Sequence, residues 1–179
     1  QHERDEIDLE VIAELRSNFP LLWGNEPDQT WATTRDGALR QLDFFLEHHL
    51  VNFGPYEDAM PHSEESWQVH HSLLSPYLNN GLLHPREVID KAIARFERGD
   101  VPLPSIEGFI RQIIGWREYV YGIYWFFGER YRKENQLRAE RKLLPLFEDP
   151  SKTQMNCIKS TVTDINDRAW VQIEEHTSE

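Results

Sequence analysis

Signals that start and stop helices are unusually dense in one stretch of the chain, HSLLSPYLNNGLLHPREV. Pro76 and Pro85 each suit the first position of a helix, where the missing backbone N–H costs no hydrogen bond. Ser75 suits the N-cap before Pro76, and the dipeptide Asn80-Gly81 favours the left-handed turn that ends a helix. The stretch therefore predicts a short helix from Pro76 and a second helix from Pro85 that ends at Gly99.

The rest of the sequence also has the spacing of apolar residues that is typical of amphipathic helices. Thr33 or Thr34 can cap a helix that ends just before Gly54. Ser105 can cap the long helix that follows it. No stretch shows the alternating polarity of a half-buried strand, so the predicted fold class is all-α. The additional helices are expected at residues 6–18, within the pattern at residues 33–54, and at residues 106–131 and 155–173.

The size and charge of the chain limit its functions. Its 179 residues are 39% hydrophobic, which is enough for one sizeable core. The net charge of −12 opposes unspecific attraction to nucleic-acid phosphates, although residues 130–142 are basic and allow a local positive patch. No apolar run is long enough to span a membrane, and the charged N-terminus lacks the apolar core of a signal peptide. We therefore expect a cytoplasmic protein.

Few residues suggest a metal or a common catalytic motif. The single cysteine, Cys157, cannot by itself form an intrachain disulfide or a four-thiolate site. His48-His49 and His70-His71 are adjacent pairs, and adjacent residues on a helix point about 100° apart, so neither pair is a chelating arrangement. The sequence also lacks a P-loop, a G-x-S-x-G motif and a G-x-G-x-x-G motif.

The expected helix at residues 106–131 combines apolar, aromatic and charged residues. Arg117 lies within its apolar stripe, and a buried guanidinium needs a partner, either a carboxylate on another helix or a bound anionic or heteroaromatic ligand. Gly108, Gly115 and Gly122 recur every seven residues on another face. Each glycine costs stability in a helix interior. Either close helix packing or the space for a flat ligand would offset that cost. The aromatic run WREYVYGIYWFF is likewise either core or a stacking platform.

The turn before Pro76 has two interpretations. In the first, Ser75 caps the helix and has no other role. Alternatively, the Ser72 hydroxyl, the Leu74 N–H and the Ser75 hydroxyl together hold a phosphate at the start of the helix. Spacing alone leaves both interpretations open.

Several motifs in order resemble a known family. They are WATTRDGAL, LDFFLEHHLVNFGPYEDAM, HSLLSPYLNNGLLHP, EGFIRQIIGWREY, LPLF and TQMNCI, and they cover residues 31–158. They resemble the FAD-binding helical domain of the photolyase/cryptochrome superfamily, specifically its prokaryotic iron-sulfur branch of deoxyribodipyrimidine photolyase-related proteins. The resemblance implies the N-terminal part of that domain, with a linker and N-terminal helix at residues 1–30 and a partial FAD-binding domain at residues 31–179.

The resemblance also implies roles for individual residues. Gln112 and Trp116 are implied to face the DNA lesion. Cys157 matches the first of four cysteines that bind a [4Fe–4S] cluster in this branch. The residues implied to bind FAD are Tyr56, His71, Ser72, Leu74, Ser75 and Arg117.

The function implied by the resemblance is light-driven DNA repair. In this family, excited reduced FAD passes an electron to a pyrimidine dimer or (6-4) photoproduct flipped out of damaged DNA. We expect this chain to be a fragment or truncated relative, without the antenna domain and the C-terminal half, and inactive alone whereas its full-length parent is a lyase. FAD should bind poorly to half a pocket, and a [4Fe–4S] cluster is not expected here. The exposed half-domain surface favours self-association or a protein partner.

Two other functions stay open at this point. The chain is alternatively a non-catalytic cryptochrome-like signalling or protein-interaction domain that keeps the helical scaffold. The remaining alternative is an unrelated all-α binding domain. Bound flavin would indicate the repair protein, a stable apo-fold with a protein partner would indicate the interaction domain, and a different helix order would indicate the unrelated fold.

Overall fold

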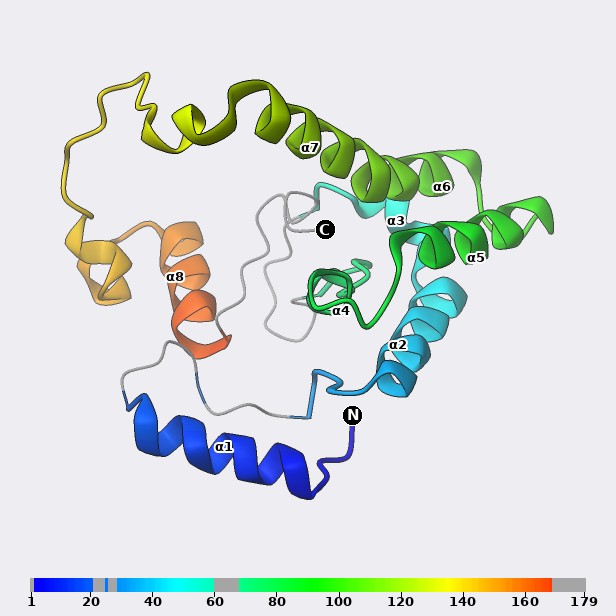
Figure 1. The fold of residues 1–179 in the computed structure, drawn as a ribbon, viewed down its shortest axis with the longest axis horizontal. Helices are drawn as coiled ribbons and strands as arrows, with labels where there is room; N and C mark the ends of the chain where they lie inside the picture. The colour runs from blue at the N-terminus through cyan, green and yellow to red at the C-terminus, as the bar shows by residue number, and fades with distance from the viewer. Residues whose placement is uncertain (1, 21–24, 26–28, 60–67, 169–179) are drawn as a thin grey trace. The chain divides into compact units, whose positions relative to one another are not determined.

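Helices and turns organise the described chain. The structure is a computed structural model that describes residues 2–20, 25, 29–59 and 68–168 (Figure 1). No strand occurs in these residues, which confirms the all-α prediction. None of their helices is long and apolar enough to cross a membrane. The chain divides into two compact units.

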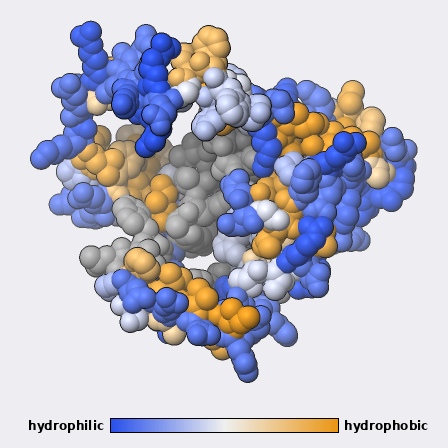
Figure 2. Space-filling model, viewed as in Figure 1, coloured by the Kyte–Doolittle hydropathy of each residue, from blue (hydrophilic) through white to orange (hydrophobic). Residues whose placement is uncertain are grey.

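The first unit comprises Gln1–Trp31 and Lys133–Gln172. Its helical elements are α1 (Glu6–Asn18), short 3₁₀ turns at Pro145–Phe147 and Pro150–Lys152, and α8 (Asn156–Arg168). Helix α1 has the predicted bounds because Asp5 and Asp8 form a reciprocal capping box. It buries none of its residues, and Figure 2 shows apolar side chains on its surface.

Helix α8 is the last helix that the structure describes. It begins at Asn156, one residue after the predicted start, and the predicted end at residues 169–173 lies outside the described residues. Val162 on this helix is buried, whereas Cys157 near its start is exposed.

The second unit comprises Ala32–Arg132 and Ile173–Glu179. Helix α5 begins at Pro85 as predicted, and His84 and Glu87 cap it reciprocally. Helix α4 differs from the prediction by one residue, since it begins at Ser75 and its N-cap is Leu74, which makes no side-chain cap. The helices of this unit are α2 (Arg35–His48), α3 (Leu50–Tyr56), α4 (Ser75–Asn79), α5 (Pro85–Glu97), α6 (Leu103–Ile110) and α7 (Trp116–Phe127).

The single helix expected at residues 33–54 is in fact two helices. Thr34 caps α2, as one of the two predicted caps, but α2 ends at His48 and His49 separates it from α3, with a φ of −117°. Gly54 does not end the helix. It lies inside α3, one residue before Pro55. The apolar spacing continues across the turn, so the pattern alone does not reveal the break.

Gly54 allows α3 to lie directly against the start of α6. A Cβ added at Gly54 would come within 2.8 Å of the backbone of Pro104 and Ser105. The Ser105 hydroxyl uses this proximity, since it accepts from the Gly54 N–H at 3.0 Å and donates to the Val51 carbonyl at 3.0 Å. Ser105 is therefore a buried cross-link between two helices and not the predicted cap, a position that Pro102 occupies.

Aromatic packing and ion pairs between α2 and α5 hold the second unit together. The rings of Phe45, Phe53 and Phe109 contact one another across α2, α3 and α6, with centroids 4.8–6.2 Å apart. Arg35 at the start of α2 makes two parallel hydrogen bonds, 3.0 and 2.8 Å long, to the Glu87 carboxylate in the cap of α5. Both helix starts are thereby fixed to each other.

The long helix expected from residue 106 is continuous but not uniform. Helix α6 passes into a π-helical segment, Arg111–Gly115, and then into α7. The predicted apolar stripe is buried in its first half, including Ile106 and Ile113, but α7 has no buried residue and Phe126 is 81% exposed. Gly128 ends α7 with a φ of +57°.

Candidate functional site

The π-helical segment gives the site its local geometry. A π turn contains one more residue than an α turn, and such turns are frequent at functional sites. Here the segment contains Gln112, which is only 5% exposed, and it directly precedes Trp116 at the start of α7. These are the two residues that the sequence assigned to the lesion pocket, and the structure brings them together.

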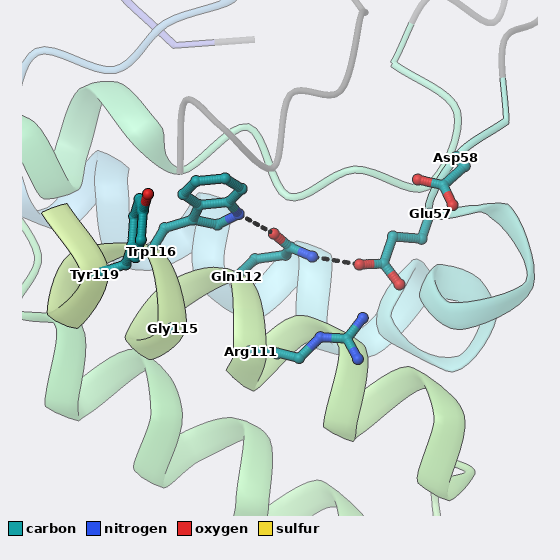
Figure 3. A pocket seen from close by; sticks show the side chains of 7 residues that line it. All are labelled: Glu57, Asp58, Arg111, Gln112, Gly115, Trp116 and Tyr119. Atoms are coloured by element: carbon teal, nitrogen blue, oxygen red, sulfur yellow. Dashed lines mark hydrogen bonds between the residues drawn. The ribbon is translucent and has the colours of Figure 1, made fainter.

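A chain of three side chains crosses from α7 to the end of α3 (Figure 3). The Trp116 indole N–H donates to the Gln112 Oε1 atom at 3.0 Å, and the Gln112 amide nitrogen donates to Glu57 Oε1. An indole can only donate and a carboxylate can only accept. The orientation of the Gln112 amide is therefore fixed by its two neighbours, with its nitrogen toward Glu57.

These side chains form one wall of a pocket of about 580 Å³. That size lies within the range of about 300–1,000 Å³ that is usual for small-molecule sites. Trp116 is 37% exposed, so part of its ring is available for stacking. Figure 3 shows the pocket side chains, which come from the end of α3, the π segment and α7. The lining residues are Glu57, Asp58, Arg111, Gln112, Gly115, Trp116 and Tyr119.

The polar turn before α4 is buried and closed on itself. Ser72 and Leu74 are fully buried, and the Leu74 N–H donates to the Ser72 hydroxyl at 3.3 Å. His71 and Ser75 are each 6% exposed, and the Gln41 amide donates to the Ser72 carbonyl at 3.2 Å. The predicted phosphate-binding groups thus lie together, but none of them lines the pocket beside Trp116.

Tyr56 and Arg117 occupy different surroundings. Tyr56 ends α3 with its ring 5.0 Å from that of His70. Arg117 is half-buried and donates to the Ile113 carbonyl one turn earlier at 2.9 Å. The structure therefore supplies a backbone acceptor for the guanidinium. It does not place Arg117 in the pocket lining.

Two histidines meet that the sequence did not connect. His49, at the turn between α2 and α3, has its Nδ1 atom 3.3 Å from that of His70. Burial, with a smaller contribution from neighbouring histidines, lowers the pKa of both imidazoles below its usual value. His49 belongs to the pair His48-His49 and His70 to the pair His70-His71. The argument that neighbouring residues on a helix point in different directions therefore does not apply to this contact.

Cys157 has no metal partners near it in the described part of the chain. There, no group of three or more histidine, cysteine or acidic side chains could hold a metal ion. The exposed thiol lies on α8, in the first unit. One thiolate does not fit a [4Fe–4S] cluster, which takes four.

The sequence interpretation missed Glu57 and Asp58. Both directly follow Tyr56 in the motif FGPYEDA, in which the family resemblance implies a role only for the tyrosine. A signal was present, because two acidic residues at the end of an apolar helix can serve as hydrogen-bond acceptors for a neighbouring helix. Nothing in the linear order, however, links Glu57 to Gln112, 55 residues later.

Fold and pocket together define an all-helical domain with a tryptophan-amide pocket at a π-helical segment. The chain is 41% identical over 166 residues, 93% of its length, to a (6-4) photolyase of Agrobacterium fabrum. It is also 43% identical over 65 residues to the uncharacterized protein R853 of Acanthamoeba polyphaga mimivirus. No family model matches the chain. Over most of its length, the chain is therefore similar to part of a (6-4) photolyase.

The similarity covers unequal shares of the proteins. The chain spans 32% of the length of the Agrobacterium photolyase. The match to the viral protein covers 36% of the chain and 48% of the viral protein. The relationship therefore concerns a part of a photolyase-like protein.

Proposed function

We propose that this chain provides the lesion-facing pocket and one wall of the flavin site of a photolyase-like DNA-repair protein. The observation that carries the proposal is the fixed Trp116–Gln112–Glu57 chain inside a pocket of about 580 Å³. The similarity to a (6-4) photolyase over 93% of the chain supports it. The alternative of a non-catalytic interaction domain gains no support from this similarity.

The pocket chemistry suits a nucleobase that has left the duplex. Repair enzymes read a flipped base by stacking and by hydrogen bonds to its edge. Trp116 offers part of its ring for stacking. Because Glu57 and Trp116 each occupy one side of the Gln112 amide, one N–H and one oxygen lone pair remain for a base edge. The net charge of −12 means that binding would depend on such base contacts more than on phosphate attraction.

The flavin role rests on a second group of residues. FAD, when bound, supplies the light-excited electron. Ser72, Leu74 and Ser75 would hold its phosphates, with His71 beside them, and Tyr56 and Arg117 would contact the rest of the cofactor. The Ser72 hydroxyl and the Leu74 N–H now bond to each other, so phosphate binding requires that this bond be exchanged for bonds to the ligand. The chain does not fit a [4Fe–4S] cluster by itself, because it has one cysteine.

Binding of damaged DNA tests the pocket. Fluorescence anisotropy would compare a labelled single strand containing a (6-4) photoproduct with its undamaged counterpart. Trp116→Ala should reduce the preference for the damaged strand about tenfold, since stacking contributes about 1–3 kcal/mol per base. Gln112→Ala should reduce it about fivefold, since a hydrogen bond to the base edge contributes about 1 kcal/mol. Trp125→Ala is the matched control, because Trp125 is 67% exposed on α7 and outside the pocket lining. Equal preferences in all variants would contradict the pocket assignment.

Flavin absorbance after gel filtration tests the cofactor wall separately. Replacing Ser72 and Ser75 by alanine should weaken the binding of FAD more than that of riboflavin, which has no phosphate. Arg117→Ala should weaken FAD binding more than the exposed control Arg130→Ala. Matched losses of FAD and riboflavin would indicate a folding defect, and equal effects at the two arginines would remove Arg117 from the site.

A further inference from the structure

The two histidines that meet beside Tyr56 are arranged like a pair of metal ligands. The Nδ1 atoms of His49 and His70 are 3.3 Å apart and face each other. Two nitrogen ligands about 2.05 Å from a tetrahedral zinc ion are about 3.3 Å apart. A hydrogen bond between the rings, in which one Nδ1–H donates to the other Nδ1, is the other interpretation of this distance.

The surroundings hold both rings in place. The His49 ring lies 5.2 Å from that of Phe44, and the His70 ring lies 5.0 Å from that of Tyr56. The two imidazoles are 5.4 Å apart between centroids, and both are half-buried. A fixed pair with part of its surface in water can accept an ion with little rearrangement, and water can complete the coordination.

We propose that His49 and His70 form a binding site for a divalent transition-metal ion, with Zn²⁺ as the probe, through their two Nδ1 atoms and bound water. Imidazole nitrogen is a favoured ligand of zinc and of copper and nickel. With two protein ligands, the site binds more weakly than a structural site with four. The argument for this site does not rest on the proposed flavin and DNA functions, because neither group of residues includes His49 or His70.

A metal at this position would connect two segments that are distant in the sequence. His49 marks the turn between α2 and α3, and His70 lies in the turn just before the buried Ser72 and Leu74. The ion would therefore restrain the approach to the polar turn. Because it binds only the folded arrangement, it should also raise the melting temperature.

The test is a zinc titration of the full chain by calorimetry, in a Cys157→Ser background that removes the exposed thiol. We expect one saturable site that His49→Phe or His70→Phe abolishes, because phenylalanine keeps the aromatic contacts but lacks the nitrogen. His48→Phe is the matched control, since His48 is exposed on α2 with its ring against Phe44. Saturable binding that is unchanged in the His49 and His70 variants, or no saturable binding in the parent chain, overturns the proposal.

A second measurement uses the unsubstituted histidines and so does not depend on whether a variant folds. Long-range ¹H–¹⁵N spectra report on each imidazole nitrogen. Zinc should shift the Nδ1 resonances of His49 and His70 and leave that of His48 in place, and it should raise the melting temperature of the parent chain. Zinc shifts confined to other histidines would contradict the site.

Discussion

Gln112 shows how neighbouring side chains can decide the role of one amide. Its oxygen accepts from the Trp116 indole and its nitrogen donates to Glu57. The indole can act only as a donor and the carboxylate only as an acceptor. The sequence predicted Gln112 and Trp116 as site residues from their motif. It did not predict Glu57, because the contact joins residues that are far apart in the chain and depends on how α3 lies against the π segment.

Removing the Glu57 carboxylate should leave the buried Gln112 amide without an acceptor. We expect Glu57→Ala to lower the free energy of unfolding by about 1–3 kcal/mol, the usual cost of an unsatisfied buried donor. The matched control is Glu107→Ala, whose carboxylate pairs with Arg111 on the exposed face of α6, where such pairs contribute about 0–1 kcal/mol. Urea unfolding measures the free energy of unfolding of both variants. Equal losses would show that the Glu57–Gln112 hydrogen bond contributes no more than an exposed ion pair.

At the scale of helices, some starts follow from local capping signals, whereas packing overrides others, such as the predicted caps Ser75 and Ser105. Pro85 and Asp5 act locally, so the starts of α5 and α1 could be found in the sequence. The break at His49 and the role of Ser105 depend on how α3 approaches α6. Apolar spacing contains no information on that approach.

Alanine substitutions at two glycines should have opposite effects on stability, because one glycine is closely packed and the other has free space beside it. Gly54→Ala should destabilise the chain by about 1–3 kcal/mol, because the new methyl group would meet fixed backbone atoms of Pro104 and Ser105 at 2.8–2.9 Å. Gly122→Ala should stabilise it by up to about 1 kcal/mol, because nothing lies within 4 Å there and alanine favours the helix. Thermal unfolding distinguishes the two, and destabilisation by Gly122→Ala would show that α7 packs closely at this point.

The ion pair between α2 and α5 should make stability depend on pH. The Arg35 guanidinium, chiefly through its hydrogen bonds, lowers the pKa of Glu87 below its ordinary value of 4.5. A lowered carboxyl pKa contributes stability that is complete above the unfolded value and is lost as the pH falls through the folded value. The difference in unfolding free energy between the parent and Glu87→Gln should therefore be constant above about pH 5 and shrink at lower pH.

Chemical denaturation at a series of pH values measures that difference. Asp90→Asn is the control, since its carboxylate pairs with Arg86 at 3.7 Å on the exposed side of α5 and such a pair contributes little. A difference for Glu87→Gln that stays unchanged down to pH 3 would mean that Arg35 does not stabilise the ionised form.

At the scale of the whole molecule, burial is concentrated in part of the second unit. Phe45, Phe53 and Phe109 join α2, α3 and α6 in one core, whereas α1 and α7 contain no buried residue. The sequence predicted the all-α class and α1 as a helix. It also predicted an apolar face on α7, but the structure buries none of its residues, because apolar spacing does not show which partner covers a helix.

Hydrogen exchange should reflect this distribution. Amide groups in α2 and α6 should exchange far more slowly than those in α1 and α7, because only the former lie against the aromatic core and open with it. Mass spectrometry of exchanged peptides gives the comparison along the chain. Protection of α7 as strong as that of α6 would show that its aromatic face is covered in solution.

The π-helical segment also sets the register between the two helices that flank it. Deleting one residue between Gln112 and Trp116 would turn its wide turn into an ordinary α turn. Because either turn closes about one full rotation, the side chains of α7 would keep their faces and the change would stay within the turn. Trp116 would then follow Gln112 by three positions instead of four, so the hydrogen bond between them would have to form across a tighter turn. Two relatives that align with a single-residue gap here would share the faces of α7 and yet present different walls to whatever enters the pocket.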